Sequence, residues 1–454
     1  MCGIALSINN GLFSEVEDMG HAIKHRGIKH EITQIDDIKA WFSWLPIVNQ
    51  KAPMQPFTVG KWTVWMNGFI SNYKELAEKY GIKLWTDCDT LLLAEFLNKF
   101  DLARLNELNG FFAIVAYDND QVHAFTDRYG VKQLYKYTNG RTTYIASEVK
   151  ALLKIMPTIK LNRLAVEDWE YSLGVMTDNT IYEGITRVEC LPFIHHPTII
   201  NIPYEDAKTE LIRLLKQSFV RNKATISDGV FLSGGIDSGI IAKWMQPDYS
   251  FSMDYLTDLS ELNNIKLNST GIHHTMICND KLKEQFVQKT IQAIDDLKVG
   301  SCYTNFALTE LASKFCTVIY SGAGGDELFY GYTHRYNKPI NDVINRTGLL
   351  VEKYFISHEE YDWRFLKGIL VVEDRIGGWH TMETRYPFLD NDLVDFVLSL
   401  PKEYRYNKKI LREVSGLHEE VVNGRKRGFS NPHFTNKEWT DFALNESCRL
   451  YHPI

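Results

Sequence analysis

The chain has 454 residues, a formal net charge of -7, and 44% hydrophobic and 24% charged residues. This length exceeds one ordinary core and indicates two domains, while the composition is that of a globular protein. The negative charge disfavours nucleic acid as a partner, because binding it requires a basic surface. The apolar runs have strand length, short of the roughly 20 residues that span a bilayer, and the N-terminus lacks a secretory pattern. Seven scattered cysteines predict neither a zinc site nor a disulfide framework. We expect a cytoplasmic protein.

The first two hundred residues alternate short apolar strands with turns. Strands are expected at residues 62–66, 111–117, 121–125 and 142–146, with a hairpin turn at 118–120. One helix is expected to open at Ser14 with Glu17 as its capping-box partner, and a second to open near Asp89. This pattern predicts an α+β domain over residues 1–203.

The pattern changes at residues 201–206, where apolar side chains begin to recur at helical spacing. Short apolar strands are then expected at residues 230–232, 251–253 and 318–320, each followed by a loop or a helix. Buried strands of this kind are typical of a parallel α/β sheet. A second domain is therefore expected over residues 204–454.

Cys2 directly follows Met1, so removal of that methionine would make the cysteine N-terminal. Its thiol could then act as a nucleophile and its α-amine as the general base, although Cys2 could also be an ordinary thiol. Asn67 and Gly68, at the expected end of a strand, could stabilise an oxyanion or form a plain turn. Asp87 could cap a helix or pair with the ammonium group of an amino-acid substrate.

The segment VFLSGGIDSGIIAKW runs from an apolar strand, through a glycine turn, into a helix that starts near Asp237. Such a turn directs backbone N–H groups at a phosphate, and the acidic Asp237 implies a bridging Mg²⁺. A second glycine loop supplies Asp326 as the other metal ligand. Because no Walker lysine follows, cleavage of ATP with release of pyrophosphate is favoured over γ-phosphoryl transfer.

The motifs of the N-terminal half resemble those of the class II, or N-terminal-cysteine, glutamine amidotransferases. They are MCGI, His25-Arg26-Gly27, Gln55-Pro56, Asn67-Gly68, Asp87, DRYGVKQLY and ASEVKALL. The resemblance implies an N-terminal nucleophile (Ntn) sandwich with Cys2 as nucleophile, Asn67 and Gly68 as the oxyanion hole, and Asp87 and Arg26 in the glutamine site. Trp44 replaces the arginine that binds the glutamine carboxylate in the family, and Phe69 replaces a glutamate.

The C-terminal half resembles the pyrophosphate-loop ATPase domain of the asparagine and β-lactam synthetases, through SGGIDS, SGAGGDE, Asp374-Arg375, ETRYPFLD and RKRGFSNP. The resemblance implies that Lys426 meets charge developing on pyrophosphate, and that Glu383 either supports acid-base chemistry or anchors Arg385. The nucleotide contacts it implies are Leu232, Ser233, Gly234, Gly235, Asp237, Ser238, Met253, Ser321 and Gly322. Ala323 and Tyr303 replace charged residues of the family's aspartate pocket.

Together these motifs predict an ATP- and Mg²⁺-dependent ligase that adenylates a carboxylate and amidates it with ammonia from glutamine. Aspartate is the default acceptor by resemblance. Two alternatives stay open: an amide synthetase for another carboxylate that uses free ammonia or another amine, and a non-catalytic nucleotide-binding protein. The expected partners are small molecules, and a homodimer is also left open.

Overall fold

The computed structural model describes residues 1–166, 179–193, 197–255, 259–295, 302–337, 357–424 and 445. Lys426 and the rest of its motif lie outside these residues. Among the helices of the described ranges, none is long and apolar enough to cross a membrane.

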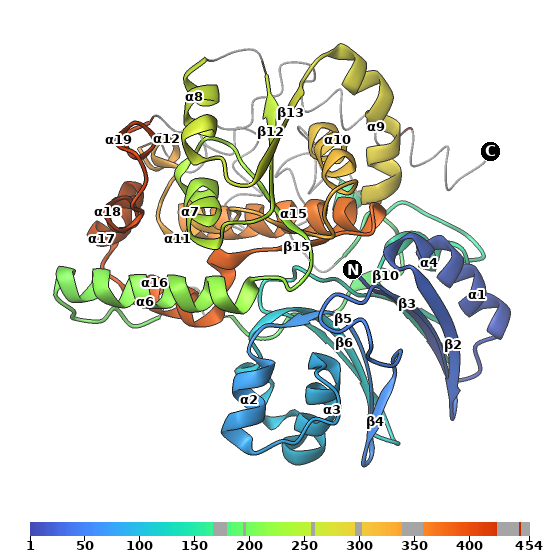
Figure 1. The fold of residues 1–454 in the computed structure, drawn as a ribbon. Coiled ribbons are helices and arrows are strands. Elements are labelled where there is room, and N and C mark those ends of the chain that lie inside the picture. Colours follow the sequence, from blue (N-terminus) through green and yellow to red (C-terminus); the bar gives the residue numbers. More distant parts are fainter. Residues whose placement is uncertain are drawn as a thin grey trace.

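The N-terminal half is a sandwich of two mainly antiparallel sheets (Figure 1). Within the described ranges, one sheet has six strands in the order β10-β8-β9-β1-β3-β2 and the other has four in the order β4-β5-β6-β7. The strands of the larger sheet are β1 (Gly3–Ile8), β2 (Lys29–Ile35), β3 (Ile38–Trp44), β8 (Tyr135–Asn139), β9 (Thr142–Ala146) and β10 (Ile185–Arg187). Those of the smaller sheet are β4 (Phe57–Val59), β5 (Trp62–Ile70), β6 (Gly110–Tyr117) and β7 (Val122–Thr126). The four predicted strands of this half and its hairpin turn are confirmed.

Helices cover the outer faces of the sandwich: α1 (Phe13–Ala22) and α4 (Val149–Leu153) on one side, α2 (Tyr73–Tyr80) and α3 (Asp89–Phe100) on the other (Figure 1). The predicted start of α3 is confirmed. The predicted capping pair of α1 is wrong, because the backbone N–H of Leu12 donates to Glu15 Oε2 at 2.7 Å and the helix begins one residue before Ser14.

Strand β5 continues four residues beyond its predicted end at residue 66. It does so because β6 remains paired with it, with Asn67 opposite Ala113 and Gly68 opposite Phe112. Asn67 and Gly68 therefore lie inside a central strand and do not form a turn.

The C-terminal half contains a parallel sheet, in the order β13-β12-β11-β14-β15 over the described residues. Its strands are β11 (Asp228–Phe231), β12 (Tyr249–Asp254), β13 (Ile272–Ile277), β14 (Val318–Tyr320) and β15 (Glu383–Arg385). The predicted strands near residues 230, 251 and 318 are β11, β12 and β14, so the α/β expectation is confirmed.

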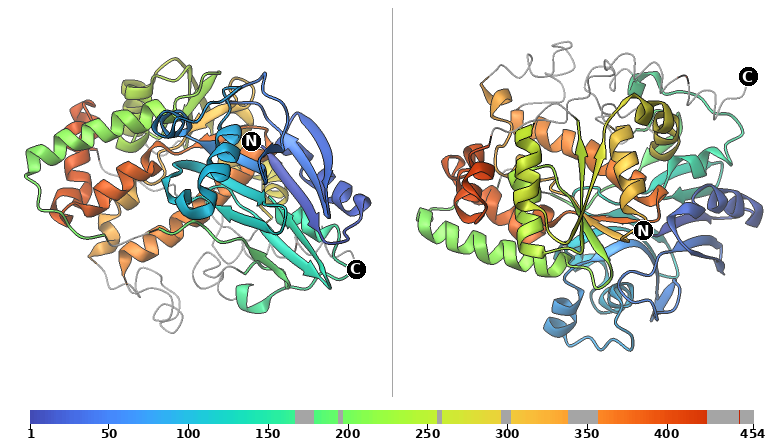
Figure 2. Two further views of the ribbon diagram at one scale, coloured as in Figure 1. Left: turned by 90° about the horizontal axis from the view of Figure 1, so that it is seen from below. Right: turned by 45° about the horizontal axis from the view of Figure 1, so that its top comes forward.

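Helices α7 (Ile236–Met245) and α8 (Leu259–Asn268) lie on one side of this sheet, and α9 (Asp280–Ile294) and α10 (Cys302–Ala312) on the other (Figures 1 and 2). Helix α15 (His358–Trp379) contacts both β15 and the turn at Lys24–Arg26 of the first half. The remaining α-helices of the described ranges are α6 (Tyr204–Asn222), α11 (Gly325–Leu328), α12 (Thr333–Tyr336), α16 (Asn391–Ser399), α17 (Lys402–Arg405), α18 (Lys409–Val414) and α19 (Glu419–Val422).

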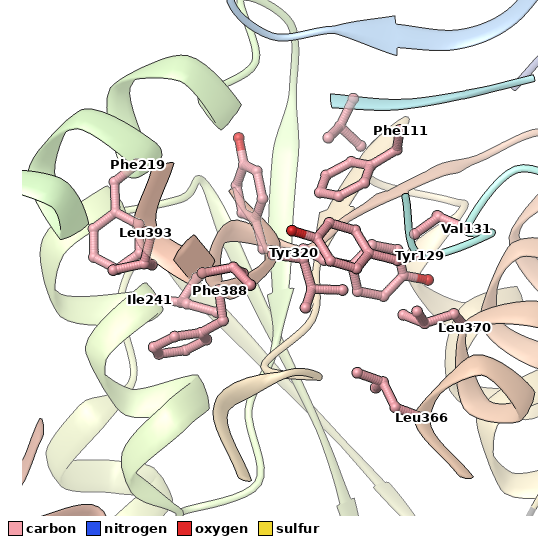
Figure 3. Packing of buried hydrophobic residues seen from close by; sticks show 14 of the residues in the cluster. Phe111, Tyr129, Val131, Phe219, Ile241, Tyr320, Leu366, Leu370, Phe388 and Leu393 are labelled. Atoms are coloured by element: carbon pink, nitrogen blue, oxygen red, sulfur yellow. The ribbon is translucent and has the colours of Figure 1, made fainter. Parts of the chain in front are cut away.

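A continuous apolar core joins the two halves (Figure 3). Phe111 and Tyr129 of the sandwich pack in the same cluster as Tyr320 and Leu370 of the other half. The ring of Phe111 meets that of Tyr386 edge-on, with centroids 5.5 Å apart. Buried aromatic pairs of this kind stabilise the contact between the two halves.

Candidate active site

Cys2 lies at the junction of the two halves, where the N-terminus is enclosed (Figure 1). The backbone N–H of Leu45 donates to Cys2 Sγ at 3.5 Å, and burial raises the pKa of the thiol. Burial also lowers the pKa of the Met1 α-amine to about 5. Removal of Met1 would replace this amine by the α-amine of Cys2, the group that could serve as the general base.

Arg26 holds the Cys2 backbone in place from a fully buried position. Its Nε donates to the Cys2 carbonyl at 2.8 Å, and its Nη1 to Glu148 Oε1 at 2.6 Å. Its Nη2 reaches Asp374 of α15 at 3.1 Å, and Lys132 Nζ lies 2.9 Å from the other oxygen of that carboxylate. Arg26 therefore holds the backbone of Cys2 and links it to the second half.

Asn67 has the properties that an oxyanion donor needs. Its side chain is fully buried, and neither its Nδ2 nor its Oδ1 has a hydrogen-bond partner among the described residues. An unpaired buried amide is costly, which favours a ligand that completes it. Strand β5, which carries Asn67, packs against β1, the strand that follows Cys2.

Gly68 can only be glycine at its position. Its φ is +130°, and a Cβ there would lie 2.1 Å from the carbonyl oxygen of Phe111. Without a side chain at Gly68, the strand can adopt this conformation next to Asn67. The backbone N–H of Gly68 could then donate to the same oxyanion as the Asn67 side chain.

Asp87 is an exposed carboxylate that already has partners. It accepts from Tyr73 Oη at 2.6 Å and from Lys74 Nζ at 3.1 Å. Although burial acts to raise it, these two contacts hold the pKa of Asp87 below its ordinary value. A substrate ammonium would therefore have to compete with Lys74.

Asp89, which the sequence analysis placed only at a helix start, is the buried carboxylate of this region. It accepts from the backbone N–H of Ile70 at 3.1 Å and of Thr90 at 2.9 Å, and it acts electrostatically on Cys2. Burial raises its pKa to about 7. In the sequence, an acidic residue at the start of a helix looks like a helix cap. The buried position of Asp89 near Cys2 could therefore not be predicted.

Trp44 and Phe69, the two departures from the amidotransferase pattern, are both buried. Lys29 Nζ lies 5.3 Å from the Trp44 ring centroid. The Arg385 guanidinium stacks on Phe69, 3.8 Å from its ring centroid, and so joins β5 to β15. Where the family has a glutamate, this chain thus has an aromatic contact between its halves.

The predicted phosphate loop follows β11 and leads into α7. The backbone N–H of Ser233 donates to Ser238 Oγ at 3.1 Å, and Gly234 has a φ of +71°. The second loop touches the first, because a Cβ on Gly322 would lie 3.1 Å from both Asp237 Cβ and Ser238 N. The structure therefore brings together two loops that are separated by about ninety residues.

Asp237 and Asp326, the predicted metal ligands, meet in this contact. Lys408, which the sequence analysis did not single out, hydrogen-bonds to Asp237 Oδ2 and lies 2.7 Å from Asp326 Oδ1. Asp237 Oδ1 is buried and accepts no hydrogen bond within the described part of the chain. The two carboxylates and the unused oxygen provide ligands of the kind that a divalent cation takes, although the ammonium of Lys408 lies between them.

Glu383 lies at the amino end of β15, opposite the strand ends that carry the two loops, since it pairs with Val318 at the start of β14. It is buried and accepts from Arg385 Nε at 2.8 Å. Burial acts to raise its pKa, but Arg385, Lys132 and the N-terminal amine hold it below the ordinary value. These contacts favour the anchoring role.

Glu373, on α15, is a carboxyl group near Ser321 of the second loop, and no sequence motif singled it out. Burial raises its pKa to about 7, although the nearby hydroxyls of Ser321 and Tyr386 act to lower it. Its position became visible only when the helix was placed against the loop.

Leu232 directly follows β11, Met253 lies near the end of the neighbouring strand β12, and both are buried. The backbone N–H of Leu232 donates to the Phe251 carbonyl at 2.8 Å. Tyr303 and Ala323 differ from the residues of the family's aspartate pocket. Tyr303 is fully buried on α10. The backbone N–H of Ala323 donates to Ser321 Oγ at 3.3 Å.

Two family models match the chain. Residues 1–196 match a glutamine amidotransferase domain, and residues 210–353 and 357–449 match the asparagine synthase model. A putative glutamine-hydrolysing asparagine synthetase of Methanocaldococcus jannaschii is 26% identical, over 90% of this chain and 82% of its own length. The glutamine-hydrolysing asparagine synthetase of Gallus gallus is 27% identical, over 81% of this chain and 70% of its own length. The chain belongs to the asparagine synthase family and carries a glutamine amidotransferase domain at its N-terminus.

Proposed function

We propose that the protein is a glutamine-dependent asparagine synthetase, an ATP-dependent ligase that amidates the side-chain carboxylate of aspartate. The observation that carries the proposal is the contact between the two glycine loops, which sets Ser238, Gly322 and the Asp237 carboxylate together at the strand ends. This arrangement occurs in a chain whose other half buries a cysteine near its N-terminus. Family membership favours this function over a ligase that uses only free ammonia and over a non-catalytic protein.

In the amidotransferase half, we assign Cys2, after removal of Met1, as the nucleophile that attacks the glutamine amide carbon. The Asn67 Nδ2 and the Gly68 N–H would stabilise the oxyanion, and the cysteine α-amine would take and return the proton. Arg26 fixes the Cys2 carbonyl. We assign Asp87 to the substrate ammonium, in place of its contact with Lys74.

In the synthetase half, residues 233–238 with Ser321 and Gly322 would bind the phosphates, and Leu232 and Met253 the adenosine. Mg²⁺, held by Asp237 and Asp326, would neutralise charge on the phosphates as the acceptor is adenylated. Within the described residues no group of three or more acidic, histidine or cysteine side chains could hold a metal alone. Phosphate oxygens and water would complete its coordination. We assign Lys426 to the pyrophosphate.

We further propose domains at residues 1–203 and 204–454, and the cytoplasm as the compartment. Glutamine, ATP and the acceptor are the proposed small-molecule partners, and a homodimer stays a prediction.

The test is a pyrophosphate-release assay over a panel of carboxylic acids that includes aspartate, with glutamine and ammonia compared as nitrogen donors. Aspartate should stimulate release with either donor and should yield asparagine. The Cys2→Ala variant should lose the glutamine reaction and keep the ammonia reaction, whereas Asp237→Asn should lose both.

Three outcomes would contradict parts of the proposal. If a different carboxylic acid stimulates pyrophosphate release and aspartate does not, that acid is the acceptor and the assignment of aspartate is wrong. Activity with ammonia alone in the wild type would remove the glutaminase role. Absence of carboxylate-dependent pyrophosphate release would remove the ligase assignment.

A further inference from the structure

The two aspartates proposed to bind the metal are already bridged by a cation that belongs to the chain. Lys408 Nζ contacts Asp237 Oδ2 and lies 2.7 Å from Asp326 Oδ1, and its side chain is only 5% exposed. Both carboxylates are largely covered as well, at 15% and 13% exposure. Because buried charges interact through a low dielectric, this ammonium strongly affects what else can bind there.

The backbone fixes Lys408 in this position. Asn407 and Lys408 have successive left-handed conformations, with φ values of +55° and +58°. The backbone N–H of Lys408 donates to the carbonyl of Phe329, just beyond the acidic loop, at 2.8 Å. Two left-handed non-glycine residues in a row are uncommon and are held here by tertiary contacts.

The glycines around the bridge leave room for the three charged groups and for little more. A Cβ on Gly331 would lie 1.8 Å from Asp326 Oδ1 and 2.5 Å from Lys408 Cε. A Cβ on Gly325 would lie 2.6 Å from Asp237 Oδ1. A divalent cation that arrives alone must therefore share this space with the ammonium group or displace it.

We propose that Lys408 is an internal counter-cation that excludes Mg²⁺ from Asp237 and Asp326 until nucleotide binds. The two carboxylates and the ammonium sum to one negative charge, which is too little to favour a free divalent cation over water. Nucleotide phosphates supply further negative charge and give the ammonium a new partner, so that metal and nucleotide enter together. Lys408 is thus a positioning residue that sets the order of binding.

This inference rests on the proposed function, because it takes Asp237 and Asp326 as the metal ligands. It is tested by Mn²⁺ titration of the full chain, with free Mn²⁺ followed by electron paramagnetic resonance. Titrations are run without nucleotide and with an ATP analogue that has a methylene group between its α and β phosphates. The variant is Lys408→Met, and the matched control is Lys409→Met, which changes the neighbouring, exposed lysine 4.7 Å from the Tyr204 ring centroid.

Wild type and Lys409→Met should bind Mn²⁺ tightly only when the analogue is present. Lys408→Met should bind Mn²⁺ without nucleotide at least tenfold more tightly than wild type, and should bind the analogue more weakly. Its midpoint of thermal unfolding should rise when Mn²⁺ alone is added, because the metal replaces the lost ammonium. If Lys408→Met does not fold, Lys408→Gln keeps a hydrogen-bond donor without the charge and should show the same change in metal affinity.

Equal nucleotide-free Mn²⁺ affinity in wild type and in the folded Lys408 variant would overturn the inference while leaving the proposed function in place. Failure of wild type to bind the analogue together with Mn²⁺ would instead overturn the proposed function, and the inference with it.

Discussion

Replacement of Asp374 by asparagine tests the link between the two halves of the molecule. This carboxylate on α15 is 2% exposed and accepts from Arg26 and Lys132 of the amidotransferase half. Burial acts to raise its pKa, but Lys132 and Arg26 hold it below the ordinary value, so it is ionised at pH 7. The Asp374→Asn variant therefore removes the negative charge that Arg26 and Lys132 share, and leaves both buried cations with less compensation.

Removing one partner of a buried ion pair costs about 3–5 kcal/mol, because the remaining charge stays desolvated. Part of this cost is offset, since Arg26 keeps Glu148 at 2.6 Å. For a cooperative unit of about 200 residues, such a loss lowers the unfolding midpoint by roughly 6–20 °C. Glutaminase activity should also fall, because Arg26 fixes the Cys2 carbonyl.

The assay is calorimetric unfolding, with initial rates of glutamine hydrolysis measured in parallel. The matched control is Asp395→Asn, which breaks the pair between Arg128 and Asp395 at 2.8 Å, also between the halves but with the aspartate 53% exposed. That change should cost at most about 1 kcal/mol. Adding Lys132→Met to Asp374→Asn should recover part of the loss, because it restores the charge balance. Equal midpoints for Asp374→Asn and Asp395→Asn would refute the reasoning.

Three further changes test individual positions. Asn67→Ala should lower kcat for glutamine hydrolysis by about 10²–10³-fold, without loss of stability, because the amide is unpaired in the folded chain; unchanged kcat would remove it from the oxyanion hole. Gly68→Ala should lower the free energy of unfolding by several kcal/mol, because the new Cβ would lie 2.1 Å from the Phe111 carbonyl oxygen. In the control Gly81→Ala, the new Cβ has no atom within 4 Å, so urea unfolding should show a loss of only about 1–2 kcal/mol, from the left-handed backbone conformation. Glu373 keeps its proton to about pH 7 when folded but only to about 4.5 when unfolded, so stability should fall by about 3 kcal/mol as the pH rises through that window. Urea midpoints of Glu373→Gln between pH 5 and 8 should show a flatter profile, and a profile parallel to that of wild type would contradict the assignment.

Local sequence patterns predicted both fold classes and seven strands of the described residues (β5, β6, β7, β9, β11, β12 and β14), because period-two alternation and short apolar runs reflect burial directly. These patterns did not predict where some helices and strands begin or end. Strand β5 extends through Asn67 and Gly68 because β6 continues to pair with it, which no local pattern of β5 could reveal. The start of α1 moved because Glu15, and not Glu17, reaches back to the helix start.

For the candidate site, too, local motifs could be recognised from the sequence, whereas contacts between distant segments could not. Cys2, Asp237 and Asp326 stand in recognisable motifs, so the sequence alone could single them out as candidates, and their roles stay predictions. Asp89, Glu373 and Lys408 could not be found in this way, since each is an ordinary charged residue until a distant segment packs against it.

By itself, the sequence determined that an N-terminal cysteine motif, a phosphate loop and a second, acidic glycine loop follow one another in the order typical of the asparagine synthase family. Only the tertiary structure decided which charges meet. It placed Arg26 between Cys2 and Asp374, stacked Phe69 on Arg385, and set Lys408 between Asp237 and Asp326. The physical reason is that motif chemistry depends on residue type and local spacing, whereas a buried charge is stable only beside partners that the fold brings from distant segments.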